Sequence, residues 1–252
     1  MTEEKETQSN QQFEGRLVEG EMVKHGTGVN SRRAFPTSNY SSSLDPFVLF
    51  ERFYIDEDKG FPMHPHKGFE IVSYMIEGGM AHEDSLGVKN TASEGEVMRI
   101  TTGSGIRHSE FPANDKSCNG LQLWVNLPRD KKEIEAGYQD AEKSELPTSE
   151  TEDAEITTVI GEGSPITLQT EMQYLDVEIS GEWSWEIREG WQGFLFGVKG
   201  SGKVKDQAFG EGDVLTIEKA DKVDIAGQEL RIVAVQGKPH NQAIRQQGPY
   251  VF

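Results

Sequence analysis

Short apolar segments separated by glycine-rich turns recur along most of the chain and limit the folds that it can adopt. The run 69–76 is rich in β-branched and aromatic residues, and Gly78-Gly79 follows it as a natural hairpin turn. Residues 121–127 alternate in the manner of a half-buried strand, and Pro128 ends that run. Strands at such short spacing predict an all-β sandwich or barrel with little helix.

The second half of the chain repeats the strand-and-turn pattern of the first half. There, Gly210-Glu211-Gly212-Asp213 precedes the apolar run 214–217, much as Glu94-Gly95-Glu96 precedes the run 97–101. We interpret the chain as two diverged copies of one β unit.

Between the two copies the composition becomes charged, and residues 144–155 are acidic with few apolar side chains. Such a stretch favours a solvated linker and places the domain boundary near 140–160. The polar amino-terminal residues are expected to be a disordered acidic tail. The expected division is a tail (1–13), an amino-terminal domain (14–140), an acidic linker (141–163) and a carboxyl-terminal domain (164–252).

Composition excludes several classes of protein. Cys118 is the single cysteine, so no intramolecular disulfide can form, which favours a reducing compartment. The net charge of −18 repels nucleic acid phosphates, and we expect no direct nucleic acid binding. No signal peptide is recognisable, and no apolar run approaches the roughly 20 residues of a membrane helix. The expectation is a soluble, cytoplasmic monomer.

The histidines indicate a metal site. Side chains two residues apart share one face of a strand, so His64 and His66 would point the same way, as would His108 and Glu110. If antiparallel pairing brings the two segments together, three imidazoles and a carboxylate converge. Imidazole and carboxylate ligands suit Fe, Mn, Ni, Cu or Zn, and with open positions they are typical of non-haem iron oxygenases.

Two carboxylates compete for the fourth ligand position. Glu70 lies four residues after His66, on the same face if the strand is regular, and Glu110 lies two residues after His108. Spacing alone does not choose between them. The carboxylate that is not a ligand could accept a proton from a bound substrate as a general base.

The remaining histidines do not extend this cluster. We expect His82 to hydrogen-bond nearby carboxylates or backbone, and His25 and His240 have no partners within motif range. No histidine occurs between Phe111 and Pro239. The second domain is therefore predicted to lack a histidine metal site and to be structural or shaped for a partner.

Several segments, in the same order, resemble the pirin family of the cupin superfamily. They are 64–70, 77–87, 102–110, 121–128 and 248–252. The resemblance implies two tandem cupin domains, each a jelly-roll β-sandwich. It also implies one metal, usually iron, in the first domain, with Glu70 left in a supporting role. The ligands that it implies are His64, His66, His108 and Glu110.

What the resemblance implies about activity takes two forms. Some pirins act as quercetin 2,3-dioxygenases, so the first hypothesis is a dioxygenase of quercetin-like flavonols or related aromatic enediols. A carboxylate, Glu110 or Glu70, would take the substrate proton. The alternative is an iron- or redox-responsive regulatory protein that binds a protein partner without catalysis. The expected cofactor is one divalent metal, first Fe(II), with Ni, Mn, Co, Cu and Zn as alternatives.

Overall fold

The structure is a computed structural model that describes residues 13–40 and 42–252. Helix in the described chain is limited to two short 3-10 segments, η1 (Arg129–Lys131) and η2 (Lys143–Glu145). Strands and turns make up most of the remainder, which confirms the prediction of an all-β fold with little helix. The expected tail, apart from its last residue Phe13, lies outside the described residues.

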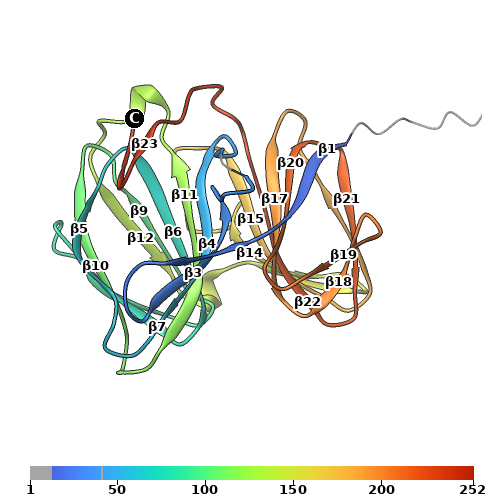
Figure 1. Cartoon of the computed structure of the whole chain (residues 1–252), viewed down its shortest axis with the longest axis horizontal. Coiled ribbons are helices and arrows are strands. Elements are labelled where there is room, and N and C mark those ends of the chain that lie inside the picture. Colours follow the sequence, from blue (N-terminus) through green and yellow to red (C-terminus); the bar gives the residue numbers. More distant parts are fainter. Residues whose placement is uncertain (1–12, 41) are drawn as a thin grey trace, which may run out of the picture.

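The strands form two domains, each with one seven-stranded and one four-stranded antiparallel sheet (Figure 1). In spatial order, the larger sheet of the first domain contains β12 (Gly137–Ala141), β9 (Val97–Thr101), β6 (Phe69–Glu77), β11 (Cys118–Asn126), β4 (Phe47–Ile55), β3 (Val29–Phe35) and β2 (Glu21–Lys24). Its smaller sheet contains β5 (Phe61–His66), β10 (Ile106–Pro112), β7 (Gly79–Asp84) and β8 (Lys89–Ser93).

The second domain repeats this arrangement. Its larger sheet contains β1 (Glu14–Glu19), β20 (Asp213–Lys219), β17 (Gln192–Lys199), β22 (Leu230–Gly237), β15 (Met172–Ile179), β14 (Ala154–Ile160) and β13 (Thr148–Glu150). Its smaller sheet contains β16 (Glu182–Glu186), β21 (Lys222–Gly227), β18 (Ser201–Val204) and β19 (Gln207–Gly210). A short hairpin of β23 (Gln246–Gln247) and β24 (Tyr250–Val251) follows.

The two domains share one order of strands. The smaller sheets run β5-β10-β7-β8 and β16-β21-β18-β19, and the larger sheets match position by position from β9 and β20 onwards. The first domain ends its larger sheet with β12, whereas the second domain takes β1 from the amino-terminal side of the chain. This repetition agrees with the interpretation of the sequence as two copies of one β unit.

The strands cross the domain limits expected from composition. The stretch 141–163, expected as an acidic linker, contains β13 and β14, and β14 pairs with β15 inside the second domain. Val159 and Ile160 are buried in the core, while Glu155 is exposed on the same strand. The acidic residues therefore occupy the solvent side of strands whose apolar residues face the interior, a pattern that average composition hides.

The larger sheets of the two domains pack against each other through one apolar cluster. It includes Phe35, Phe47 and Phe50 from the first domain and Phe194 and Phe196 from the second. The ring of Phe194 lies 4.7 Å from that of Phe50 and 5.0 Å from that of Phe35, measured between centroids. The shared core fixes the two domains relative to each other.

Phe194→Ala should therefore destabilise both domains together. Removing a fully buried aromatic side chain costs about 3–5 kcal/mol of unfolding free energy, because the cavity is only partly filled by relaxation. Urea unfolding followed by fluorescence and circular dichroism measures the loss. Phe111→Ala, at an exposed residue, is the matched control. A loss for Phe194→Ala no larger than that of the control would contradict the shared core.

Candidate metal centre

The centre lies on β10, which pairs with β5 on one side and with β7 on the other. His108 is opposite His64 of β5 and Asp84 of β7, and Glu110 is opposite His82 of β7. Residues directly opposite one another in an antiparallel sheet have side chains on the same face, about 4.5–5.5 Å apart at Cβ. The register of β10 therefore gathers polar side chains from three strands at one place.

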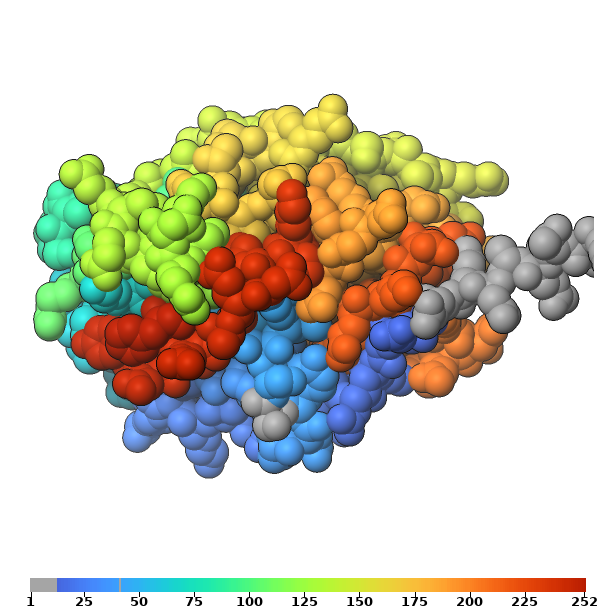
Figure 2. Space-filling view, turned by 90° about the horizontal axis from the view of Figure 1, so that it is seen from above, coloured from blue at the N-terminus to red at the C-terminus, as the bar shows by residue number. Residues whose placement is uncertain are grey.

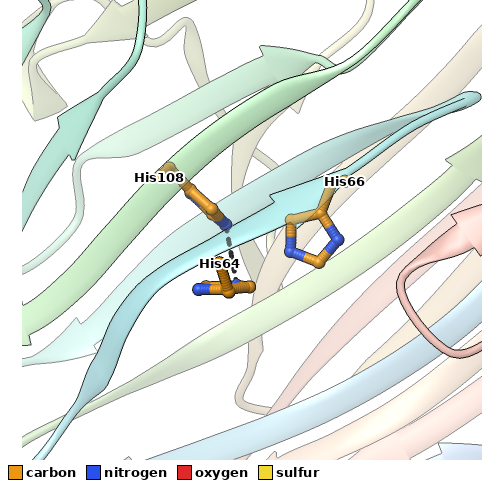
Figure 3. Close-up of side chains that lie close together, drawn as sticks. All are labelled: His64, His66 and His108. Carbon is orange, nitrogen blue, oxygen red and sulfur yellow. Dashed lines mark hydrogen bonds between the residues drawn. The ribbon is translucent and has the colours of Figure 1, made fainter.

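Three imidazoles meet there, as Figure 3 shows. Nε2 of His108 is 3.1 Å from Nε2 of His64, and the ring of His66 lies within 4.9 Å of both other rings, measured between centroids. One nitrogen from each ring lies within 4.8 Å of the others. The structure thus brings together the two histidine segments that the sequence leaves 42 residues apart. Together they form a group of donors that could hold a metal ion.

Backbone carbonyls define which nitrogen of two rings carries the proton. Nδ1 of His64 is 2.8 Å from the carbonyl oxygen of Pro62, and Nδ1 of His66 is 3.3 Å from that of Pro249. A carbonyl oxygen only accepts hydrogen bonds, so Nδ1 of each ring donates and Nε2 keeps its lone pair. Outer hydrogen bonds of this kind orient histidine ligands in metal sites.

Burial and electrostatics keep the rings of His66 and His108 neutral. Burial first, and then repulsion of a second positive charge by the rings of His108 and His64, together lower the pKa of His66 to about 3. Burial likewise holds the pKa of His108 well below its ordinary value. Neutral imidazole is the form that binds a metal. At neutral pH the rings of His66 and His108 therefore need not lose a proton before a metal binds.

Glu110 adds a buried carboxylate beside the rings. The residue is 2% exposed, and its Oε1 has no hydrogen-bond partner among the described residues. Its Oε2 is 3.5 Å from Nε2 of Gln122. Glu110 forms a second close group with His82 and His108, so His108 belongs to both groups. A carboxylate buried without a full set of partners is costly unless a cation compensates it, and so this donor set fits a divalent metal.

Glu70 does not join the rings, contrary to the expectation for a regular strand. Gly68 adopts a positive φ of 89° and separates β5 from β6, so Glu70 lies on a strand of the other sheet. Its carboxylate accepts hydrogen bonds from Oγ1 of Thr101 at 2.7 Å and from the amide of Gln169 at 2.8 Å. Burial raises its pKa. Glu70 therefore links the first domain to the loop before β15.

A cavity of about 330 Å³ opens beside the rings of His64 and His66. The aromatic side chains of Phe61 on β5 and Trp124 on β11 line it. Besides the histidines and Glu110, polar lining comes from elements without a recognisable motif. These side chains are His25 before β3, Arg33 on β3, Glu51 on β4 and Gln122 on β11.

The polar wall is held by one buried carboxylate. Oε2 of Glu51 accepts hydrogen bonds from Oγ of Ser31 at 2.9 Å and from Nε of Arg33 at 2.8 Å. His25, which lacks a partner within motif range in the sequence, lies 2.9 Å from Oγ of Ser31 through its Nε2. The only sequence signal for this wall is a pair of opposite charges, Arg33 on β3 and Glu51 on the neighbouring strand β4.

The carboxyl-terminal segment of the second domain forms another wall of the same cavity. Gln246 and Gly248 line it, and the carbonyl of Pro249 is the one that His66 contacts. The amide of Val251 donates to the carbonyl of Lys67 at 3.0 Å. In Figure 2 this segment crosses the surface of the first domain. Sequence reasoning missed this contribution, because nothing local links the segment to a site 180 residues earlier.

Lys132 fastens this segment to the turn after β5. Its Nζ donates to the carbonyl of Gly68 at 2.7 Å and to the carbonyl of Val251 at 3.3 Å. A side chain at Gly68 would overlap the carbonyl oxygen of Val251. The close approach of these two backbones explains why glycine is needed at this turn.

The corresponding part of the second domain is apolar. There β16 pairs with β21 as β5 pairs with β10, and Trp185 lies opposite Val223. Both side chains are buried in the second core cluster together with Ile225. The two groups of donors that could hold a metal both lie in the first domain, as far as the described residues extend. The tryptophan at this position packs in the core of the second domain.

The fold and the site together define a two-domain cupin with one histidine-rich centre. Residues 28–125 match the family model described as Pirin, and residues 174–252 match the model of the Pirin C-terminal cupin domain. A pirin-like protein of Solanum lycopersicum is 35% identical over 244 residues, covering 90% of this chain and 82% of that relative. The chain therefore belongs to the pirin family, as the resemblance of its motifs implies.

Solved structures show the same fold. A quercetin 2,3-dioxygenase from Acinetobacter baumannii aligns with a TM-score of 0.86 at 23% identity, covering 96% of this chain and 92% of that one. A bacterial pirin from Escherichia coli, solved in complex with nickel(II), aligns with a TM-score of 0.74 at 21% identity, covering 90% and 99%. Among the described residues, no helix has the length and apolar character needed to cross a membrane.

The low pKa of His66 predicts a pH dependence of stability in the metal-free protein. Below about pH 6.5 the unfolded chain protonates His66, but the folded protein does not until about pH 3, so stability falls as the pH falls through this window. Between pH 6.5 and 5 the loss from this residue is at most about 2 kcal/mol.

Urea unfolding of EDTA-treated protein at both pH values measures this loss. His66→Gln removes the titrating group and should show a smaller loss of unfolding free energy over the same interval. If the variant and the wild-type protein lose equal stability, His66 is not held neutral by the fold.

Proposed function

We propose that the chain is a metal-dependent dioxygenase of quercetin-like flavonols or related aromatic enediols. In this proposal His64, His66, His108 and Glu110 hold one divalent metal, first Fe(II), with Ni, Mn, Co, Cu and Zn as alternatives. The observation that carries it is the convergence of three imidazoles beside a cavity with aromatic side chains. A bound metal of this kind would activate the enediol oxygens and O₂ toward each other.

Aromatic side chains would position the substrate. The ring of Trp124 lies 4.3 Å from that of Phe69 and 5.2 Å from that of His66, measured between centroids, so the indole is fixed beside the histidines. Trp124 and Phe61 both line the cavity. A flat polyphenol can stack on such rings, and each good aromatic contact contributes about 0.5–1.5 kcal/mol beyond burial of its area.

Glu110 would take the proton of the substrate hydroxyl. Nε1 of Trp124 donates to Oε1 of Gln122 at 3.1 Å, and Nε2 of Gln122 lies 3.5 Å from Oε2 of Glu110. This chain of side chains orients the carboxylate from the cavity wall. A positioned general base contributes typically about 10²–10⁴-fold to a rate, and a carboxylate beside a metal is well placed for this role.

The walls from the second domain would exclude water. The segment that contains Gln246 and Gly248 lines the cavity, and Lys132 hydrogen-bonds to that segment at Val251. Exclusion of water strengthens the electrostatic interactions at the reacting atoms and limits side reactions. In this proposal the second domain supports the reaction without binding a metal itself.

Oxygen uptake with quercetin tests this proposal. Protein loaded separately with Fe(II), Ni(II) or Co(II) should consume O₂ when quercetin is added. His108→Ala should lose both the bound metal and the uptake. Glu110→Gln removes both a proposed ligand and the base, so kcat should fall by roughly 100-fold even when the bound metal is measured and the rate is expressed per metal ion. Glu70→Gln, which alters a buried carboxylate outside the donor groups, is the matched control and should keep the activity.

The outcomes separate the two classes of function. If no metal supports O₂ uptake with any flavonol or catechol, the dioxygenase proposal is wrong. The alternative is then the regulatory protein that binds a partner without catalysis. Metal content alone does not discriminate between them, since both need the centre.

A further inference from the structure

Two buried side chains beside the centre are not used by the proposed reaction. His82 and Asp84 lie on β7, directly opposite Glu110 and His108 of β10. Both side chains are 0% exposed, and Nε2 of His82 is 3.2 Å from Oδ2 of Asp84. Burying a histidine and a carboxylate costs free energy, so other interactions must offset that cost.

Asp84 is fixed by the turn that follows it. Its Oδ1 accepts hydrogen bonds from the amide of Leu86 at 2.8 Å and from the amide of Val88 at 3.1 Å. Its Oδ2 is thereby aimed at His82. Because a carboxylate accepts, Nε2 of His82 carries a proton and donates a hydrogen bond to Asp84. With its proton on Nε2, the ring offers Nδ1 as an acceptor.

The ring plane of His82 is fixed as well. Tyr138 of β12 stacks on it with centroids 5.0 Å apart and an angle of 21° between the planes. The hydroxyl of Tyr138 accepts a hydrogen bond from Nδ2 of Asn90 at 2.9 Å. Neither the position nor the orientation of the imidazole is therefore free to vary.

His108 presents the complementary atom. Its Nε2 faces His64, so binding of a metal through Nε2 places the ring proton on Nδ1. Nδ1 of His108 and Nδ1 of His82 are both buried and without a hydrogen-bond partner among the described residues. The two rings are 5.5 Å apart between centroids, and donor atoms of the two residues come within 4.8 Å of each other.

We infer that Asp84 and His82 are positioning residues for the metal centre. In the metal-bound protein, Nδ1–H of His108 would donate a hydrogen bond to the unpartnered Nδ1 of His82, and Nε2–H of His82 donates a hydrogen bond to Asp84. These hydrogen bonds fix the ring of His108 and make its Nε2 a stronger ligand for the metal. The inference rests on the proposed ligand role of His108, but not on the reaction or the substrate.

The opposite tautomer of His82 is electrostatically unfavourable. A proton on Nδ1 would allow a hydrogen bond to Glu110, but it would leave the lone pair of Nε2 facing the carboxylate of Asp84 at 3.2 Å. Both groups would then be buried acceptors without a shared proton, which costs free energy. The two amides that fix Asp84 prevent it from turning away.

Asp84→Asn is the variant that tests these hydrogen bonds separately from the metal ligands. The asparagine oxygen can still accept from the amides of Leu86 and Val88, but its NH₂ group donates to Nε2 of His82. The ring of His82 then carries its proton on Nδ1, where it meets the Nδ1 proton of His108. Metal affinity should fall roughly 10–100-fold, the usual effect of losing such an outer partner.

Two measurements test the inference. Chelator competition with Ni(II) and Zn(II) gives the metal affinity of wild-type protein, Asp84→Asn and the exposed control Asp221→Asn. Long-range proton–nitrogen NMR of the Zn(II)-loaded wild-type protein gives the tautomers. We expect His82 protonated at Nε2 and His108 at Nδ1, with the proton of His82 moved to Nδ1 in Asp84→Asn.

Each outcome decides a separate point. A proton on Nδ1 of His82 in the wild-type protein overturns the inference, and this readout needs no variant to fold. Wild-type affinity in Asp84→Asn also overturns it. His64→Ala is the check on the centre itself, because if it binds metal as tightly as wild-type protein, the proposed ligand set is wrong.

Discussion

The register of β10 between β5 and β7 is the constraint on which the centre depends. It places His108 opposite both His64 and Asp84, and Glu110 opposite His82. Because side chains alternate along a strand, a shift by one residue would turn His108 and Glu110 to the outer face. Buried apolar side chains of β10, such as Ile106, favour this register because a shift would expose them.

The two domains have the same fold but contribute differently to the site. Both have the same order of strands, but the space between the sheets is polar around the histidines in the first domain and apolar around Trp185 in the second. The second domain instead supplies part of the shared core and the segment that lines the cavity near His66. The two domains therefore share one apolar cluster and one cavity.

Much of the fold could be predicted because strands leave a local signal. Alternation and glycine turns predict the sandwich, and two residues on one strand, such as His64 and His66, reveal their common face. The pairing of β1 with the second domain could not be predicted, since no local signal specifies a partner some 200 residues away. Acidic composition between the domains also concealed β14.

The candidate site shows the same limit. The spacing left Glu70 and Glu110 equivalent, and only the break at Gly68 directs Glu70 into the other sheet. Glu51 and Pro249 reach the cavity through tertiary packing, so their spacing from the histidines carries no information. His82 could be assigned a carboxylate partner from its neighbours, but its closeness to His108 depends on the pairing of β7 with β10.

The most direct measurement is X-ray absorption spectroscopy of the protein as purified, paired with elemental analysis. We expect one divalent metal per chain with three imidazole nitrogens at about 2.0–2.2 Å and at least one oxygen ligand. His64→Ala should remove one imidazole from that shell. A protein that binds no metal, or a metal shell without histidine, would contradict the central claim that these strands build a metal centre.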